Sequence, residues 1–100
     1  MAIENDAPIL RIFEFVLDPH DLPPSLEAGR INIEASLRNE PGVLSVYCAV
    51  DTDDPTRLYG VEVYRDQAAY QAHVESAHFK TFLRASEGKV ISRQIIQTIR

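Results

Sequence analysis

Both faces of the expected β-strands are largely apolar, and this two-sided pattern limits what the chain can fold into. Alternate residues of a strand point to opposite sides, and in Ile9–Leu17 and Arg57–Arg65 both sets are mostly aromatic or aliphatic. One layer of helices covers only one side of such a sheet and would leave the other as an exposed apolar patch. The sequence therefore predicts a homodimer, in which a second copy covers the remaining side through a self-complementary contact.

The first half of the chain is expected to form a strand, a helix and a strand. The strand Ile9–Leu17 ends before a proline, and a helix begins near Pro23, with Asp21 or Ser25 as its N-cap. One narrow apolar stripe is expected on this helix, formed by Leu26, Gly29, Ile33 and Leu37. The helix ends at residues 39–42. In the next strand, alternation places Val43, Ser45, Tyr47 and Ala49 on one side and Leu44, Val46, Cys48 and Val50 on the other.

The second half completes a recognisable order of elements. A loop of turn-forming residues at 51–56 joins two strands into a hairpin, and Asp66 caps a helix that runs to about residue 75. Ser76 caps another helix, Gly88 ends it, and Val90–Ile99 is the last strand. The order β-α-β-β-α-β predicts an α+β, ferredoxin-like fold with a four-stranded antiparallel sheet. We expect one domain over residues 1–100, with 1–8 as an N-terminal extension.

Composition excludes several classes of function. The net charge is -5 and the cationic residues are scattered singly, so neither a nucleic acid nor a membrane is an expected partner. Cys48 is the single cysteine, which excludes an internal disulfide, and its apolar surroundings favour an inert thiol. The first six residues carry two acids and no basic residue, unlike a secretory signal, so a cytoplasmic protein is expected.

Two histidines are the strongest candidates for chemistry. His73 lies on the apolar stripe of its helix, and His78 falls in the first turn of the next helix, where the helix dipole disfavours the charged imidazolium. A neutral imidazole among aromatic side chains suits a general base. The alternative is that each histidine only satisfies a backbone carbonyl and fills space.

A carboxylate on an apolar strand is the other unusual feature. Glu62 is costly there unless it is paired, and Arg11, Arg65 and Arg93 are the candidate partners. The acidic hairpin does not match a calcium-binding loop, because Thr56 stands where the turn requires glycine. The two histidines are five residues apart across a helix break, which is not a chelating spacing on one helix face. We therefore expect no metal site.

Several motifs together resemble the antibiotic biosynthesis monooxygenase family. They are Asn39-Glu40-Pro41-Gly42-Val43-Leu44, Asp53-Asp54-Pro55, Val61-Glu62-Val63-Tyr64-Arg65-Asp66, Ala69-Tyr70-Gln71-Ala72-His73 and Ser76-Ala77-His78-Phe79. The resemblance runs from about Leu10 to Ile99. It implies a dimeric α/β barrel built from two ferredoxin-like subunits, in agreement with the two-sided strands.

The resemblance also implies an activity and a site. Family members are small enzymes that oxygenate electron-rich aromatics such as quinols without metal or flavin, so no cofactor is expected. Glu62, His73, His78 and Phe79 match the motif positions of the family, and Tyr64 stands where members usually have Trp. The haem-degrading branch relies on a Trp, which this chain lacks, so haem is not expected.

The expected mechanism places a base and a donor in a dry pocket. His78 is the expected base, Tyr64 or His73 holds the substrate anion, and Glu62 completes the catalytic set. The pocket walls are expected to be Phe79, Phe82, Tyr70, Phe13 and Tyr47. A proton-transfer isomerase or lyase in the same pocket, and a non-catalytic ligand-binding dimer, remain the alternatives.

Overall fold

The computed structural model describes residues 7–99, so the expected N-terminal extension at 1–8 lies largely outside the described residues. The elements in chain order are β1 (Ile9–Leu17), α1 (Leu22–Asn39), β2 (Val43–Val50), β3 (Arg57–Tyr64), α2 (Gln67–Val74), α3 (Ala77–Ser86) and β4 (Val90–Ile99). A one-turn 3-10 helix, Pro19–Asp21, joins β1 to α1. None of the described helices is long and apolar enough to cross a membrane.

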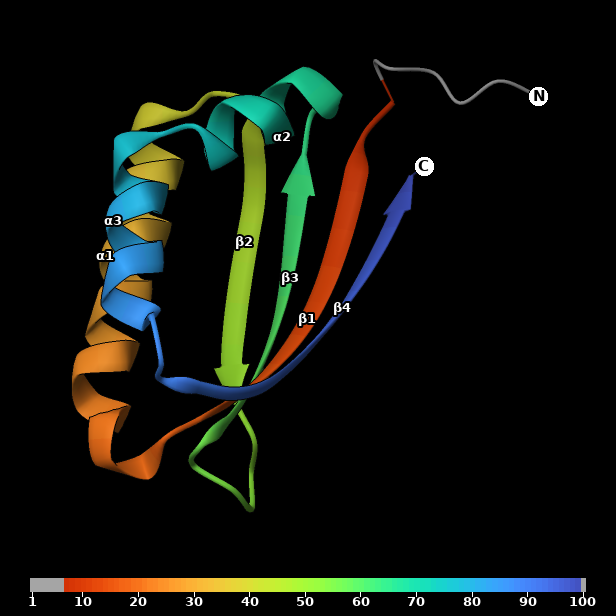
Figure 1. Cartoon of the computed structure of the whole chain (residues 1–100). Helices are drawn as coiled ribbons and strands as arrows, with labels where there is room; N and C mark the ends of the chain where they lie inside the picture. The colour runs from red at the N-terminus through yellow and green to blue at the C-terminus, as the bar shows by residue number, and fades with distance from the viewer. Residues whose placement is uncertain (1–6, 100) are drawn as a thin grey trace.

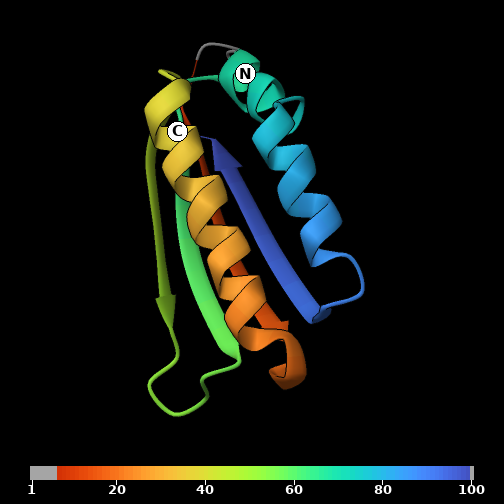
Figure 2. The same ribbon diagram turned by 90° about the vertical axis from the view of Figure 1, so that its left-hand side faces the viewer.

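The four strands form one antiparallel sheet in the order β2-β3-β1-β4. All three helices lie on one side of it, and β1 and β4 curve away from them (Figure 1). Turned by 90°, the molecule shows α1 and α3 running side by side in front of the sheet (Figure 2). The α+β ferredoxin-like fold predicted from the sequence is confirmed.

Local capping residues set most helix boundaries. Asp66 accepts a hydrogen bond from the Ala69 N–H at the start of α2, and Ser76 accepts one from the Phe79 N–H at the start of α3, as expected. The prediction of Ser25 as a cap of α1 is wrong. Asp21 takes the N-cap position. The helix begins at Leu22, so Ser25 is already inside the helix, where it is buried.

The predicted stripe of α1 is partly wrong. Leu37 is 49% exposed, whereas Ser25 and Ser36 are the buried residues of this helix. The helix packs against both β2 and α3, so its covered strip is narrow and runs through small residues. Ser36 fits there because its hydroxyl donates to the Asn32 carbonyl at 2.7 Å.

Gly29 gives a prediction about stability. A Cβ at this position would lie 3.9 Å from Phe82 Cε1, an ordinary contact. We therefore expect Gly29→Ala to raise the free energy of unfolding by about 1 kcal/mol, because glycine is a poor helix former. Gly88→Ala is the control: Gly88 has φ +76°, which alanine adopts only with strain. The free energy of unfolding in urea should rise for Gly29→Ala and fall for Gly88→Ala. If both variants lost stability, the conclusion that there is room for a Cβ at Gly29 would be wrong.

The predicted faces of β2 need one correction. A register shift lies between Val43 and Ser45, so Val43 pairs with Tyr64 and faces the helices together with Val46 and Cys48. A strict alternation had placed Val43 on the opposite side. The extra residue of such a bulge reverses the facing of the side chains beyond it relative to strict alternation. The faces of β1 and β3 follow the predicted alternation.

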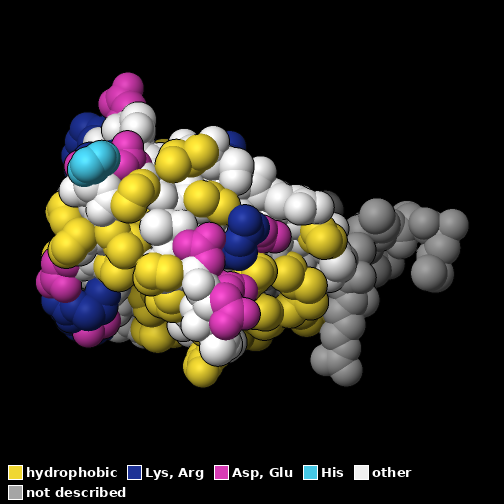
Figure 3. Space-filling view, turned by 90° about the horizontal axis from the view of Figure 1, so that it is seen from below, with side chains coloured by type: hydrophobic (Ala, Val, Ile, Leu, Met, Phe, Trp, Pro, Cys, Tyr) yellow, Lys and Arg dark blue, Asp and Glu magenta, His cyan; other side chains and the backbone are white. Residues whose placement is uncertain are grey.

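The face of the sheet away from the helices is called the free face here. Paired residues form an apolar row across all four strands, from Tyr47 through Val61 and Ile12 to Ile96. The exposed fractions of these side chains are 71%, 37%, 39% and 50%. Hydrophobic side chains are also widely exposed at the end of the molecule seen in Figure 3, with charged groups between them. The described chain therefore leaves the predicted apolar side uncovered.

The core is small and lies at one end of the sheet, under α2. Its cluster consists of Ile9, Val43, Tyr64 and Ala69. Gly42 lets the chain pass close to α2, since a Cβ there would come within 2.4 Å of the Ala69 Cβ. This end of the sheet carries the polar cluster described next.

Candidate functional site

One carboxylate and two imidazoles meet beside this core. Glu40 Oε2 lies 2.9 Å from His73 Nδ1 and 2.6 Å from His78 Nε2. The side chains are 13%, 4% and 18% exposed, in the order Glu40, His73, His78. One oxygen atom thus serves two rings in a largely dry setting.

Three chain segments bring these side chains together. Glu40 is the C-cap of α1, His73 lies in the last turn of α2, and His78 lies in the first turn of α3. Ser76 fixes the junction of the last two, because its hydroxyl donates to the His73 carbonyl at 2.6 Å and accepts from the Phe79 N–H. The two histidines therefore face the end of α1 although a helix break separates them.

Tyr64 extends the cluster towards the sheet. It is fully buried, its ring meets that of Tyr70 edge-on at 5.1 Å, and the His73 ring lies 5.4 Å away. Burial, followed by the negative charge of Glu62, raises the pKa of Tyr64 far above its ordinary value. The phenol therefore stays protonated and can act only as a neutral hydrogen-bonding group.

Two buried polar atoms in these neighbouring rings have no protein partner. They are the Tyr64 hydroxyl and the Nε2 atom of His73. The His73 residue is 3% exposed, so solvent has little access to it. A buried polar atom without a partner costs about 1–3 kcal/mol, and such atoms are uncommon in native proteins.

The same three side chains also form a group of metal-ligand types. Glu40, His73 and His78 each offer one atom, and these atoms lie within 4.8 Å of one another. In a tetrahedral zinc site with bonds of about 2.0–2.1 Å, ligand atoms lie roughly 3.3 Å apart. The carboxylate oxygen is closer than that to both nitrogens, at 2.9 and 2.6 Å. The arrangement is therefore that of hydrogen bonds.

Glu62 pairs with Arg11, one of its three expected partners. Arg11 Nη1 donates to Glu62 Oε1 at 3.0 Å on the helix side of the sheet, with both side chains mostly buried. Arg11 Nε also donates to Gln97, and its guanidinium lies over the Tyr70 ring at 5.0 Å. The pairing with Arg65 is wrong, because that side chain pairs with Asp66.

The predicted aromatic walls are only partly assembled. The Phe79 ring lies 4.8 Å from His73, and Phe82 follows it along α3 towards Gly29. The Phe13 ring lies directly over Gly60, on the helix side, where any Cβ would collide with it. Tyr47 lies away from these rings. It pairs with Val61 on the free face and is 71% exposed, because alternation along β2 points it away from Val46 and Cys48, which face the helices.

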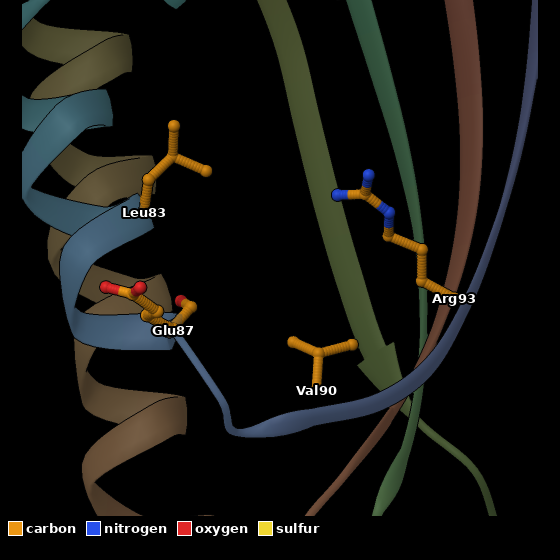
Figure 4. Close-up of a pocket in the computed structure, with 5 residues that line it drawn as sticks. Leu83, Glu87, Val90 and Arg93 are labelled. Atoms are coloured by element: carbon orange, nitrogen blue, oxygen red, sulfur yellow. The ribbon is translucent and has the colours of Figure 1, made fainter.

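An open pocket lies further along α3. It has a volume of about 500 Å³ and is lined by Leu83, Ser86, Glu87, Val90 and Arg93. The Arg93 guanidinium extends from β4 towards the helix side, where Leu83 and Glu87 stand (Figure 4). This volume suits a small organic molecule, but the pocket is at the opposite end of α3 from His78.

Two other candidates have structural explanations. Burial and the charge of Glu62 raise the pKa of the Cys48 thiol, which suits the inert thiol expected from the sequence. In the acidic hairpin, Asp51 accepts hydrogen bonds from the N–H groups of Asp53 and Asp54 and from the Tyr59 hydroxyl. These carboxylates hold the turn.

Sequence reasoning missed the role of Glu40. It treated residues 39–42 as the end of a helix and as part of a family motif. The sequence did contain one signal: Glu40 ends a helix and directly precedes Pro41-Gly42, so the sharp turn that follows the helix fixes the position of its carboxylate. Nothing local indicates which later side chains it meets.

The comparisons with known proteins agree with this architecture. Three solved structures at 25–28% identity illustrate the similarity. One is a candidate antibiotic biosynthesis monooxygenase from Bacteroides thetaiotaomicron, with 28% identity and a TM-score of 0.90, over 95% of this chain and 90% of that one. A protein of the same description from Nitrosomonas europaea has 25% identity and a TM-score of 0.86, over 100% and 95%. A Pseudomonas aeruginosa protein has 27% identity and a TM-score of 0.84, over 97% of both chains.

The family model described as antibiotic biosynthesis monooxygenase matches residues 11–85. Proteins with curated functions give no match. The matched range includes every residue of the Glu40, His73, His78 and Tyr64 cluster. Sequence motifs, strand order and the family model thus lead to one conclusion: the chain belongs to the antibiotic biosynthesis monooxygenase family.

Proposed function

We propose that this protein is a cofactor-independent monooxygenase acting on a small electron-rich aromatic molecule of the hydroquinone or anthrone type. The family supports an oxygenase, and one observation carries the assignment of the site. The Tyr64 hydroxyl and His73 Nε2 are buried in neighbouring rings without a protein partner. A substrate oxygen that bonds to both atoms would satisfy them.

In this proposal His73 is the general base. Its Nδ1 lies 2.9 Å from Glu40, so Nε2 is the nitrogen left to take a proton from the substrate. The sequence favoured His78 for this role, but His78 Nε2 lies 2.6 Å from the same carboxylate. We therefore give the base role to His73 and a supporting role to His78.

Tyr64 is the donor that holds the substrate anion. Its raised pKa keeps the hydroxyl protonated while the substrate loses its proton. A donor that is already oriented in a dry site stabilises developing negative charge without reorganisation. The ion pair of Arg11 with Glu62 lies beside Tyr70 and keeps the neighbouring sheet surface electrically balanced.

The proposed reaction needs no external reductant. His73 takes a proton from a phenolic O–H or from a CH₂ group between two aromatic rings, and the anion then transfers electrons to O₂. In an anthrone the CH₂ carbon becomes a carbonyl, one atom of O₂ forms that C=O group, and the other leaves as water with the two hydrogens. The four electrons that reduce O₂ all come from the substrate carbon.

The substrate is proposed to enter along α3. The open pocket beside Leu83 and Arg93 gives the point of entry. The proposed path then follows α3 to Phe79, whose ring lies 4.8 Å from that of His73. Phe79 must therefore turn aside before the substrate contacts Nε2. Side-chain rotation of this kind is fast compared with typical turnover.

We also propose that the protein is a homodimer joined through the free face. The apolar row from Tyr47 to Ile96 supports this contact, because it crosses all four strands and stays exposed in one chain. If two copies met through their free faces around a two-fold axis, each copy would cover the apolar row of the other.

The test of the activity is oxygen consumption with a panel of hydroquinones and anthrones. We expect the wild-type protein to consume O₂, and we expect His73→Gln to lose about 10²–10⁴-fold in rate, the usual contribution of a general base. His20→Gln is the matched control, since His20 is exposed and lies in the 3-10 helix between β1 and α1, far from His73 in the sequence. Equal rates for His73→Gln and the wild type would remove His73 from the mechanism. Absence of O₂ consumption across the panel would contradict the proposed activity.

A further inference from the structure

The bond pattern around Glu40 determines where the protons of both histidines lie. A carboxylate only accepts hydrogen bonds, so each ring nitrogen that contacts it must carry hydrogen. His73 therefore has its proton on Nδ1, and His78 has its proton on Nε2. In neutral His73 the lone pair is then on Nε2, which is the buried atom without a partner.

Among the described residues, no other side chain competes with His73 and His78 for the Glu40 carboxylate. In the part of the chain that the structure describes, this carboxylate accepts hydrogen bonds from the two rings alone. The Glu40 backbone N–H donates to the Ser36 carbonyl and its backbone carbonyl accepts from the Val43 N–H, both at 3.0 Å. The rings packed around His73 are Tyr64 from β3 and His78 and Phe79 from α3. None of these bonds to a His73 nitrogen, so Glu40 alone orients the ring.

We propose that Glu40 is the positioning residue of the site, and this inference rests on the proposed function. It holds His73 in the tautomer whose Nε2 lone pair meets the substrate. When His73 accepts the substrate proton on Nε2, the imidazolium that forms keeps its Nδ1–H bond to the carboxylate. The proton comes from the substrate O–H or C–H, and Glu40 itself stays ionised.

His78 has a second role in the same arrangement. Its Nε2–H occupies the remaining acceptor direction of Glu40 Oε2, which stops the carboxylate from rotating away from His73. The Glu40 carboxylate thus links the end of α1 to α2 and α3 at once. A single charge both fixes the base and joins three helices.

The first test uses the wild-type protein and needs no turnover. Long-range ¹H–¹⁵N NMR correlations distinguish the two imidazole tautomers, and the chain has only 3 histidines. His20→Gln and His78→Gln assign the signals. We expect His73 to be protonated on Nδ1 and His78 on Nε2. A His73 ring protonated on Nε2 would overturn the inference, whatever the activity of the protein.

The second test compares Glu40→Gln with Glu75→Gln. Glu75 is an exposed residue whose carboxylate accepts a hydrogen bond from the Gln71 side chain at 3.1 Å, and its replacement should leave both rings unchanged. Glu40→Gln should give His73 a mixture of tautomers and lower kcat at least about tenfold, with KM changed less than about twofold. An unchanged His73 tautomer in Glu40→Gln would refute the positioning role. If the tautomer changes as expected in a protein that consumes no O₂, the inference about Glu40 stands and the proposed activity fails.

Discussion

A Tyr64→Phe variant should be more stable than the wild type and yet much slower in oxygen consumption. The Tyr64 hydroxyl is buried without a partner, so its removal should raise the free energy of unfolding by about 1–3 kcal/mol. The same change removes the donor proposed to hold the substrate anion, and loss of such a donor costs about 10²–10³-fold in kcat. Urea unfolding and oxygen uptake measure the two effects independently.

Tyr59→Phe provides the matched control. The Tyr59 hydroxyl donates to Asp51 at 3.0 Å in the exposed hairpin, so its loss should lower stability by less than about 1 kcal/mol and leave kcat unchanged. Tyr64→Phe is distinguished from this control by the combination of a higher free energy of unfolding and a lower kcat. If Tyr64→Phe lowered stability and left the rate unchanged, the phenol would have a structural role and the site assignment would be wrong.

A Val61→Lys variant should dissociate the proposed dimer. Val61 is on β3, between Tyr47 and Ile12 in the apolar row of the free face. A contact related by two-fold symmetry would bury two new ammonium groups close together, and unpaired buried charges cost several kcal/mol each. We expect the dissociation constant to rise at least about 100-fold, which corresponds to about 2.7 kcal/mol.

Sedimentation equilibrium measures this change. The wild type should have twice the chain mass of 11.3 kDa at micromolar concentration, and the variant should approach the mass of one chain. Ile31→Lys is the control, because Ile31 lies on α1 and is already 51% exposed. A folded wild-type monomer at micromolar concentration would contradict the dimer, and an unaffected Val61→Lys dimer would exclude the free face as its interface.

Much of the fold follows from short-range features of the sequence. The caps Asp66 and Ser76 fix two helix starts through hydrogen bonds that span three residues, and strict alternation in β1 and β3 gives their faces correctly. The bulge in β2 is different in kind. It depends on how Val43 packs against Tyr64, 21 positions later in the printed sequence, and no local pattern marks it. The misplacement of Val43 arises there. Tyr47 lies on the side that alternation predicts, but that side is the free face and not the face with the histidines.

The candidate site was predicted less completely than the fold. The two histidines were found because they lie on aromatic stretches of amphipathic segments. Glu40 was missed as a partner because it is separated from them by 33 and 38 residues. The choice of base also depended on three-dimensional geometry, since only the bond to Glu40 shows which nitrogen of each ring is left free.

Turnover under ¹⁸O₂ tests the central claim most directly. After exhaustive dialysis against a metal chelator, the protein should convert an anthrone to the corresponding quinone at an undiminished rate. Mass spectrometry should find one ¹⁸O atom in each product molecule and the second in water. A product without ¹⁸O, or activity that is lost on chelation and restored by a divalent metal, would contradict cofactor-independent oxygenation at His73.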